Sequence, residues 1–213
     1  MRHTTGKPTR EPTGASRRLQ VTKLLCNKVR TLATHQIQDR FFANAKSPRT
    51  ATAKFVSRLV RDDLVVTSRI SAARLSISSP LLVWLPSSAE PPNWERLAYA
   101  NQKRWQIEPQ HTTCLIATAR AHGLYGGRPR RIRSLELEHD MAVAAVYLSL
   151  DQHRARDWVL EDNIRPNSIR CRRPDALIEG TDPTVIDVIG RGYSAEKIEL
   201  IWRAFRNHRL ELR

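Results

Sequence analysis

The sequence predicts an α+β fold in two parts, on three observations. Apolar residues recur at helical spacing three times before residue 63, and short β-branched runs follow them. Residues 135–210 then read as helix, strand, strand and helix. The 213 residues are enough for one large or two small domains, each with its own core. We therefore expect a helical N-terminal part and an α/β C-terminal part.

Three helices are expected in the N-terminal part. The first covers about 19–31, and the second begins near Thr34, a residue suited to cap a helix. The third starts at Ser47-Pro48, a cap followed by proline at the first helical position, and ends near Asp62. Its apolar side is predicted to be Ala51, Phe55, Val56, Leu59 and Val60. Its outer face is predicted to be Arg49, Thr50, Thr52, Lys54, Ser57, Arg58 and Arg61.

The segments LVVTSRI and AARLSIS follow as two predicted strands, with LLVWL as a candidate third. Three helices followed by strands are typical of a winged helix-turn-helix, whose third helix enters a major groove. Arg69 and Arg74 lie near the predicted wing. The predicted nucleic-acid contacts are Arg49, Thr50, Thr52, Lys54, Arg58, Arg61, Arg69 and Arg74. The alternative is a winged helix that serves only dimerisation or protein binding.

Positive charge is concentrated at the N-terminal end. The whole chain carries a formal charge of +15. Residues 1–74 hold 16 Lys and Arg against 4 Asp and Glu, a net +12, whereas residues 75–213 hold 20 against 17, a net +3. A phosphate backbone is the partner that this distribution favours, with a basic surface kept for solubility as the alternative. Residues 1–18 read as a disordered basic arm that lies along phosphates.

The sequence lacks the signals of several other classes of protein. The three cysteines, Cys26, Cys114 and Cys171, lack the spacing of a disulfide framework or zinc site, which fits a reducing cytoplasm. The longest apolar run, Met141 to Leu150, is about half the length that spans a bilayer. The first residues lack the apolar core of a secretory signal, and no phosphate-binding glycine motif is present.

A connector is predicted between the two parts, over 87–110. It begins with turn residues and ends in a short helix through Trp94, Leu97 and Trp105. The following run, HTTCLIATARAHGLY, is compatible with a strand through Cys114 to Ala117 or with a helix through Ala121. The arginine-rich GGRPRRIR loop contacts phosphate or is merely solvated, and the sequence does not separate these alternatives.

The C-terminal part, 111–213, combines predicted helices and strands with acidic residues. A helix is expected over Leu135–Leu150, with Glu136, His139, Asp140 and Tyr147 along one side. Acidic residues at this helix start also suit the helix dipole. Strands are expected over Cys171–Glu179 and Thr184–Ile189, and a helix capped by Ser194 follows. This order around carboxylates is that of a restriction-endonuclease-like core.

Asp175, in a Pro-Asp step, and Asp187 are predicted to meet at the mouth of one hairpin. Carboxylates are the ligands that Mg²⁺ and Mn²⁺ prefer, so the predicted metal ligands are Asp175 and Asp187, with Glu138 or Asp140. A metal-dependent nuclease would carry a lysine where this chain has Ile189, and Lys197 is the candidate replacement. Tyr193 and Tyr147 are alternative nucleophiles for a phosphotyrosyl link, with a core role preferred for Tyr147.

The segments HDMAVAAVYLSL, RPDALIE and VIDVIGRGYSAEKIELIWRAF, with Trp158 and Glu161 between them, resemble the replication-relaxation family of plasmid and mobile-element proteins. The resemblance covers roughly residues 19–210. It implies a winged helix over 19–86 joined to a PD-(D/E)xK-like domain, similar to one class of plasmid mobilisation relaxases. It points to His139, Asp140, Asp175 and Asp187 as site residues, while Ile189 departs from the pattern.

These observations lead us to expect a cytoplasmic DNA-binding protein of a plasmid or mobile element, acting in replication, mobilisation or its control. In this hypothesis the nuclease-like domain is degenerate and needs no cofactor. The alternative is an active nickase or relaxase that uses Mg²⁺ or Mn²⁺, with Asp175, Asp187, His139 and Lys197 as catalytic residues. A structural adaptor is a third class, which the high charge disfavours. The expected partners are double-stranded DNA, a homodimer mate or a mobile-element protein, and no membrane.

Overall fold

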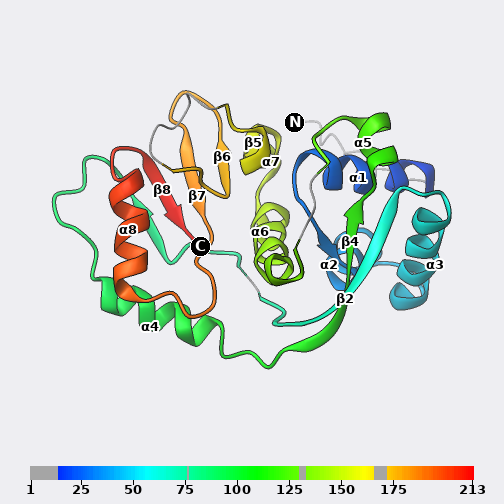
Figure 1. The fold of residues 1–213 in the computed structure, drawn as a ribbon, viewed down its shortest axis with the longest axis horizontal. Coiled ribbons are helices and arrows are strands. Elements are labelled where there is room, and N and C mark those ends of the chain that lie inside the picture. The colour runs from blue at the N-terminus through cyan, green and yellow to red at the C-terminus, as the bar shows by residue number, and fades with distance from the viewer. Residues whose placement is uncertain (1–13, 76, 130–132, 166–171) are drawn as a thin grey trace, which may run out of the picture.

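A computed structural model describes residues 14–75, 77–129, 133–165 and 172–213, and its mixture of helices and strands confirms the α+β class (Figure 1). Residues 1–13 of the predicted basic arm lie outside the described residues, and the prediction of residues 14–18 as disordered arm is wrong, because they form the first turns of α1. The N-terminal elements are α1 (Gly14–Asn27), β1 (Leu32–Ala33), α2 (Thr34–Phe41), α3 (Pro48–Arg61) and β2 (Val65–Ala72). The middle of the chain forms β3 (Leu82–Trp84), α4 (Trp94–Arg104), β4 (Gln110–Ala117) and α5 (Ala119–Tyr125).

The C-terminal elements begin with a 3₁₀ turn, η1 (Ser134–Glu136), that leads into α6 (Leu137–Ser149). They continue with α7 (Gln152–Asp157), β5 (Trp158–Leu160), a second 3₁₀ turn, η2 (Glu161–Asn163), β6 (Ala176–Ile178), β7 (Thr184–Asp187), α8 (Ala195–Phe205) and β8 (Arg209–Leu212). Within the described residues, no helix is long and apolar enough to cross a membrane.

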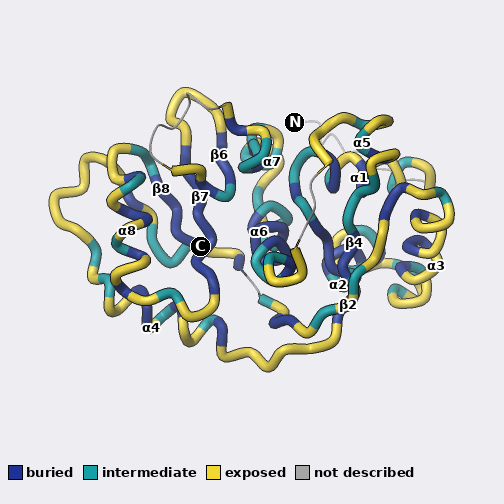
Figure 2. The backbone as a smooth tube through the Cα atoms, in the orientation of Figure 1, coloured by how far each residue is buried: buried dark blue, intermediate teal, exposed yellow. Residues whose placement is uncertain are grey.

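The strands form two sheets. The first has the order β1-β4-β2 and is antiparallel, with Val65 opposite Ala117 and Ala72 opposite Gln110. The second has the order β3-β8-β7-β6-β5. Its pairs are antiparallel except β7 and β8, which run parallel, as α8 connects them across the sheet. β6 and β7 are buried along their full lengths (Figure 2).

The two sheets exchange elements across the boundaries expected from the sequence. After β2 the chain leaves the first sheet, adds β3 to the edge of the second beside β8, and returns as β4, the central strand of the first. The expected connector, 87–110, contains α4, whose Leu97 and Ala98 pack with Ile198 and Ile201 of α8. The middle of the chain thus contributes to both sheets.

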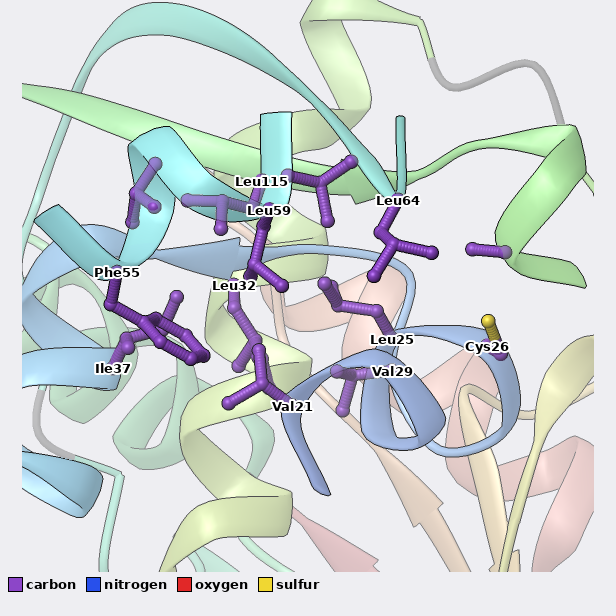
Figure 3. Close-up of a cluster of buried hydrophobic side chains, with 14 of the residues drawn as sticks. Val21, Leu25, Cys26, Val29, Leu32, Ile37, Phe55, Leu59, Leu64 and Leu115 are labelled. Carbon is purple, nitrogen blue, oxygen red and sulfur yellow. The ribbon is translucent and has the colours of Figure 1, made fainter. Parts of the chain in front are cut away.

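The N-terminal core gathers around the first sheet. Val21 and Leu25 of α1, Leu59 of α3 and Leu115 of β4 are buried together, as Figure 3 shows. Burying such aliphatic side chains contributes about 1.5–3 kcal/mol each relative to leaving them exposed. The amphipathic stripes of α1 and α3 are therefore accounted for by this core.

Helix α6 lies between the two sheets and packs against both (Figure 1). Ala144 belongs to the N-terminal core, whereas Val143 and Val146 are buried with Trp158 and Ile186 of the second sheet. A helix with apolar residues on most of its circumference is typical of a buried position. Because α6 also carries His139 and Asp140, this packing fixes the start of the helix relative to both sheets.

Several local predictions need correction. AARLSIS forms no second strand: Ala72 ends β2, and the other described residues of this run lie outside any strand. LLVWL pairs with β8 rather than β2. The run HTTCLIATARAHGLY combines both alternatives, a strand followed by a helix. Thr34 is the first residue of α2 rather than its cap, because the Gln36 side chain accepts the Ala33 N–H at 2.9 Å. Strand partners depend on tertiary contacts, which short runs of sequence do not specify.

The face of α3 was also predicted wrongly at two positions. Thr52, predicted on the outer face, is 3% exposed, whereas Val60, predicted inward, is 44% exposed. Thr52 stands three, four and seven residues before Phe55, Val56 and Leu59, so the helical period itself places it on the buried side. Val60 lies beyond the edge of that stripe.

Candidate functional site: a carboxylate and histidine cluster beside a basic helix

Histidine 139, in the first turn of α6, contacts Asp175 just before β6. Its Nε2 lies 3.0 Å from Asp175 Oδ1. The other carboxylate oxygen, Asp175 Oδ2, accepts the backbone N–H of Val188 at 2.7 Å. The backbone carbonyl of Asp175 accepts the N–H of Glu161 at 3.0 Å. Asp175 is therefore held from three sides, by α6, the end of β7 and the turn after β5.

Asp187, the last residue of β7, is almost fully buried beside this pair. It is 2% exposed, and its Oδ2 accepts no hydrogen bond among the described residues. The nearest cation is Arg172, with its Nη2 3.7 Å from Asp187 Oδ2. Burial and the charge of Asp175 raise the pKa of Asp187 well above its ordinary value, and Arg172 and His139 oppose that shift. Asp187 therefore keeps its proton to higher pH than an exposed carboxyl group does.

His139 carries positive charge over a wider pH range than an exposed histidine. Burial lowers its pKa, but the hydrogen bond and charge of Asp175, with the charges of Asp140 and Asp187, outweigh burial and raise it to about 8. A protonated His139 at neutral pH offsets the charge of Asp175. The positive charge of His139 and the negative charge of Asp175 thus compensate each other within the folded protein.

Asp140 faces away from this pair toward Arg30, in the loop after α1. Arg30 is 10% exposed and contacts three carboxylates, those of Asp140 (3.3 Å), Asp162 (2.8 Å) and Glu161. Burial raises the pKa of Asp140 to about 6, against the lowering effect of Arg30 and His139. Arg30 thereby joins the N-terminal part to α6 and η2, the two elements that hold His139 and Asp175.

Lys28 adds a second link at this junction. Its Nζ donates to the backbone carbonyls of Arg156 (2.9 Å) and Trp158 (2.7 Å), and the Trp158 indole donates to the Lys28 carbonyl at 2.9 Å. Tyr147 packs against Trp158 with ring centroids 5.6 Å apart at 71°. Burial raises the pKa of Tyr147, so the structure favours the core role over that of a nucleophile.

Only two of the four predicted metal ligands, Asp175 and Asp187, come together. Glu138 accepts the Ala73 N–H at 2.9 Å and pairs with Arg191 at 3.1 Å. In the residues that the structure describes, no three His, Cys, Asp or Glu side chains form a group able to hold a metal ion. With Glu138 and Asp140 directed to other partners, two carboxylates remain, and this donor set does not fit Mg²⁺ or Mn²⁺ as arranged.

The predicted replacement lysine, Lys197, does not contact either carboxylate among the described interactions. Its Nζ lies 3.5 Å from the centroid of the Tyr193 ring. Burial, with the charges of Asp187 and Asp175, raises the pKa of Tyr193, so the phenol is not activated as a nucleophile. Tyr193 in turn rests on Gly190, where an added Cβ would approach the ring to 2.7 Å. Ile189 is buried, and its backbone N–H donates to the carbonyl of Arg213.

The predicted nucleic-acid residues of α3 remain exposed apart from Thr52. Arg49, Thr50, Lys54, Arg58 and Arg61 are exposed along α3, and Arg69 in β2 and Arg74 after it are exposed as well. Lys54, Arg58 and Arg61 line one side of a groove of about 740 Å³, and Arg17 and Arg18 of α1 line the other. Asp62 partly offsets this charge through a 2.7 Å contact with Arg18.

The α3 surface and α8 lie at opposite ends of the molecule (Figure 1), with the carboxylate cluster on the α8 side of α6. No family model, curated protein or solved structure matches this chain. Its function must therefore be inferred from its own residues, and the resemblance to the replication-relaxation family stays a prediction.

Sequence reasoning missed two residues of this region. Arg172 was not assigned a role, although it stands three residues before Asp175, close enough to share its site. Arg30 gave no signal, because its partners lie 110 to 132 positions away in the chain. The one local feature that could have indicated a cation partner is the pair of adjacent acidic residues, Glu161 and Asp162.

Proposed function

We propose that this protein binds double-stranded DNA through its N-terminal part, with α3 as the helix that contacts the duplex. The observation that carries the proposal is the set of exposed cations on α3, within a segment of net charge +12: Lys54, Arg58 and Arg61 lie on one side of the helix, and Arg49 lies in its first turn. Cations presented on one face of a helix neutralise phosphates and release counterions on binding.

The element order supports a winged helix as the scaffold for this contact. The sequence of α1, β1, α2, α3, β2 and β4, with the sheet order β1-β4-β2, is compatible with three helices against a small antiparallel sheet. Between β2 and β4, residues 73–109 occupy the place where a short wing would be expected. Arg69 and His111, both exposed and two places apart across the β2–β4 pair, lie near its base.

The C-terminal part supports a nuclease-like scaffold that has lost its catalytic arrangement. The order α6, β5, β6, β7, α8, β8 and the parallel β7–β8 pair agree with a restriction-endonuclease-like core. Asp175 before β6 and Asp187 in β7 occupy the positions where such a core carries its carboxylates. The buried Ile189 stands where a nuclease of this kind carries its lysine, and the His139 imidazole is hydrogen-bonded to Asp175. We infer a DNA-binding protein of a plasmid or mobile element, in agreement with the resemblance.

Binding to a fluorescein-labelled 20-base-pair duplex tests the proposal. We expect affinity to fall by at least tenfold between 50 and 200 mM salt, because each neutralised phosphate adds about 0.9 to the slope. The double variant Arg49→Ala, Arg58→Ala should weaken binding far more than the matched variant Arg203→Ala, Arg206→Ala, at the C-terminal end of α8. Equal losses from the two variants would show that α3 is not the binding surface.

An active nickase is the second candidate, favoured by the meeting of His139, Asp175 and Asp187 in one cluster. Mg²⁺ or Mn²⁺ would supply the activation of water in such an enzyme. Because both Asp175 oxygens are engaged, this candidate requires the His139 contact to open. Supercoiled plasmid incubated with either metal should be nicked by the wild type and not by Asp175→Ala, Asp187→Ala. Intact plasmid that is retarded on a gel supports the first proposal instead.

A further inference from the structure

We propose that Arg172 is a phosphate-binding residue, the cation through which the carboxylate cluster accepts a DNA phosphodiester in place of the lysine missing at Ile189. The inference rests on the proposed function, which it deepens by assigning a second DNA contact to the C-terminal part. It concerns binding and requires no cleavage.

The position of Arg172 carries this inference. Its Nη2 lies 3.7 Å from Asp187 Oδ2, a separation too long for a hydrogen bond. The Arg172 side chain is 44% exposed, whereas that of Asp187 is 2% exposed. The guanidinium therefore stands at the mouth of the cluster, attracted inward by a buried carboxylate, with its N–H groups directed to no described hydrogen-bond acceptor.

Electrostatics explain why a cation is needed at this point. A phosphodiester that approaches the cluster is repelled by the negative charge of Asp175, and by that of Asp187 when it is ionised, unless positive groups offset it. His139 neutralises Asp175 from the α6 side, at 3.0 Å. Arg172 supplies positive charge on the Asp187 side, and its planar fork of donors suits two oxygens of one phosphate.

The other cations near the cluster are engaged elsewhere. Arg191 pairs with Glu138 at 3.1 Å and lies over the Trp105 ring. Lys197 packs against the Tyr193 ring, with its Nζ 3.5 Å from the ring centroid. Arg173 is exposed and next in sequence but makes no described contact with either carboxylate. Arg173 is therefore a control for Arg172 that matches it in charge, exposure and location.

A short single strand tests the inference with the full-length chain. In the Arg49→Ala, Arg58→Ala background, which removes two of the four proposed α3 cations, binding of fluorescein-labelled dT12 is measured by anisotropy at 50 mM salt. We expect Arg172→Ala to weaken binding about tenfold, as loss of a charge-assisted pair of hydrogen bonds to phosphate would. Arg173→Ala should change it less than about threefold, and Arg172→Lys should restore part of the loss. Equal losses from Arg172→Ala and Arg173→Ala would overturn the inference.

A direct readout separates contact from general charge. The side-chain Nε–Hε resonance of Arg172 should shift when dT12 is added to the wild-type protein, and that of Arg173 should not. An unshifted Arg172 resonance at saturating dT12 would also overturn the inference. Failure of the proposed function would give a different result, namely duplex binding that is insensitive to the α3 variants.

Discussion

His139 Nε2 lies 3.0 Å from Asp175 Oδ1, and this contact joins the first turn of α6 to the strand pair β6–β7. Protonation of the His139 imidazole therefore contributes to the stability of the C-terminal sheet. Its consequences can be measured by titration.

Replacing Asp175 by asparagine should lower the pKa of His139 from about 8 toward the ordinary histidine value of about 6.5. The hydrogen bond and charge that raise the pKa are removed while the shape of the side chain is kept. Histidine Cε1–Hε1 resonances followed from pH 5 to 9 report the shift. A His139 pKa that stays near 8 in the variant would assign the shift to Asp140 and Asp187 instead. The exposed His153 serves as the internal reference.

The same pair predicts a loss of stability at mildly alkaline pH. Because the folded-state pKa of His139 lies above its unfolded value, the stabilisation is complete below about pH 6.5 and disappears as pH rises through 8. Its size is roughly 1–2 kcal/mol, since a pKa unit corresponds to about 1.4 kcal/mol. Urea unfolding at pH 6, 7 and 8.5 measures it, and Asp175→Asn should remove that part of the pH dependence. An unchanged pH dependence would contradict the assignment.

Arg30→Met should destabilise the protein strongly. The change leaves Asp140 buried without its cation and removes the ion pairs to Glu161 and Asp162, and breaking a buried pair costs about 3–5 kcal/mol. Arg156→Ala provides the control, because its pair with Asp157 is 72% exposed on the arginine side and should contribute little to stability. The free energy of urea unfolding distinguishes the two variants, and similar small losses would show that Arg30 is not a junction residue.

Thr52→Val should leave duplex binding unchanged and the protein equally or more stable. The Thr52 hydroxyl is buried and has no described hydrogen-bond partner, so replacing it by a methyl group of similar shape removes a desolvation cost of about 1–3 kcal/mol at most. Duplex affinity and the midpoint of urea unfolding are the two readouts. A loss of affinity comparable to that of Arg58→Ala would restore Thr52 to the binding surface.

Gly190→Ala should cost about 1–3 kcal/mol, because its new Cβ meets the Tyr193 ring at 2.7 Å. In a double-mutant cycle with Tyr193→Ala, most of that cost should disappear, since the obstructing ring is gone. Gly123→Ala in α5 is the control: nothing lies within 4 Å of its added Cβ, and helix propensity predicts a gain of about 0.5–1 kcal/mol. If the free-energy changes of the two single variants simply add in the double variant, the cost arises from the backbone at Gly190 and not from the Tyr193 ring.

Local signals predicted most of the helices, although α1 begins and ends about five residues earlier than predicted and α7 was missed. Ser47-Pro48 marked the start of α3, and the Ser194 side chain does accept the Lys197 N–H at 3.3 Å, as its predicted capping role requires. Caps and periodicity act within a few residues, so the chain displays them directly. The meeting of Asp175 with His139 was predicted only in outline, from a resemblance.

Nonlocal relationships were beyond the sequence. The choice of β4 rather than β3 as the partner of β2 depends on which surfaces each strand buries in the folded chain. The separation of Glu138 and Asp140 from Asp175 depends on the rotation of α6, which a shift of one residue changes by about 100°. The contacts of Arg30 depend on how the N-terminal part packs against α6 and η2, and the spacing of residues in the sequence does not indicate that packing.

The route of the chain from β2 through β3 and α4 back to β4 determines how this molecule could be divided. A fragment ending at residue 86 would carry β1 and β2 without the strand that joins them, and a fragment beginning at 111 would lack the edge strand β3 and the helix that covers α8. The first fragment therefore loses the central strand of its sheet, and the second loses an edge strand and a covering helix. The two parts are therefore expected to unfold in a single transition, and neither can be exchanged as a module by cutting the chain at its middle.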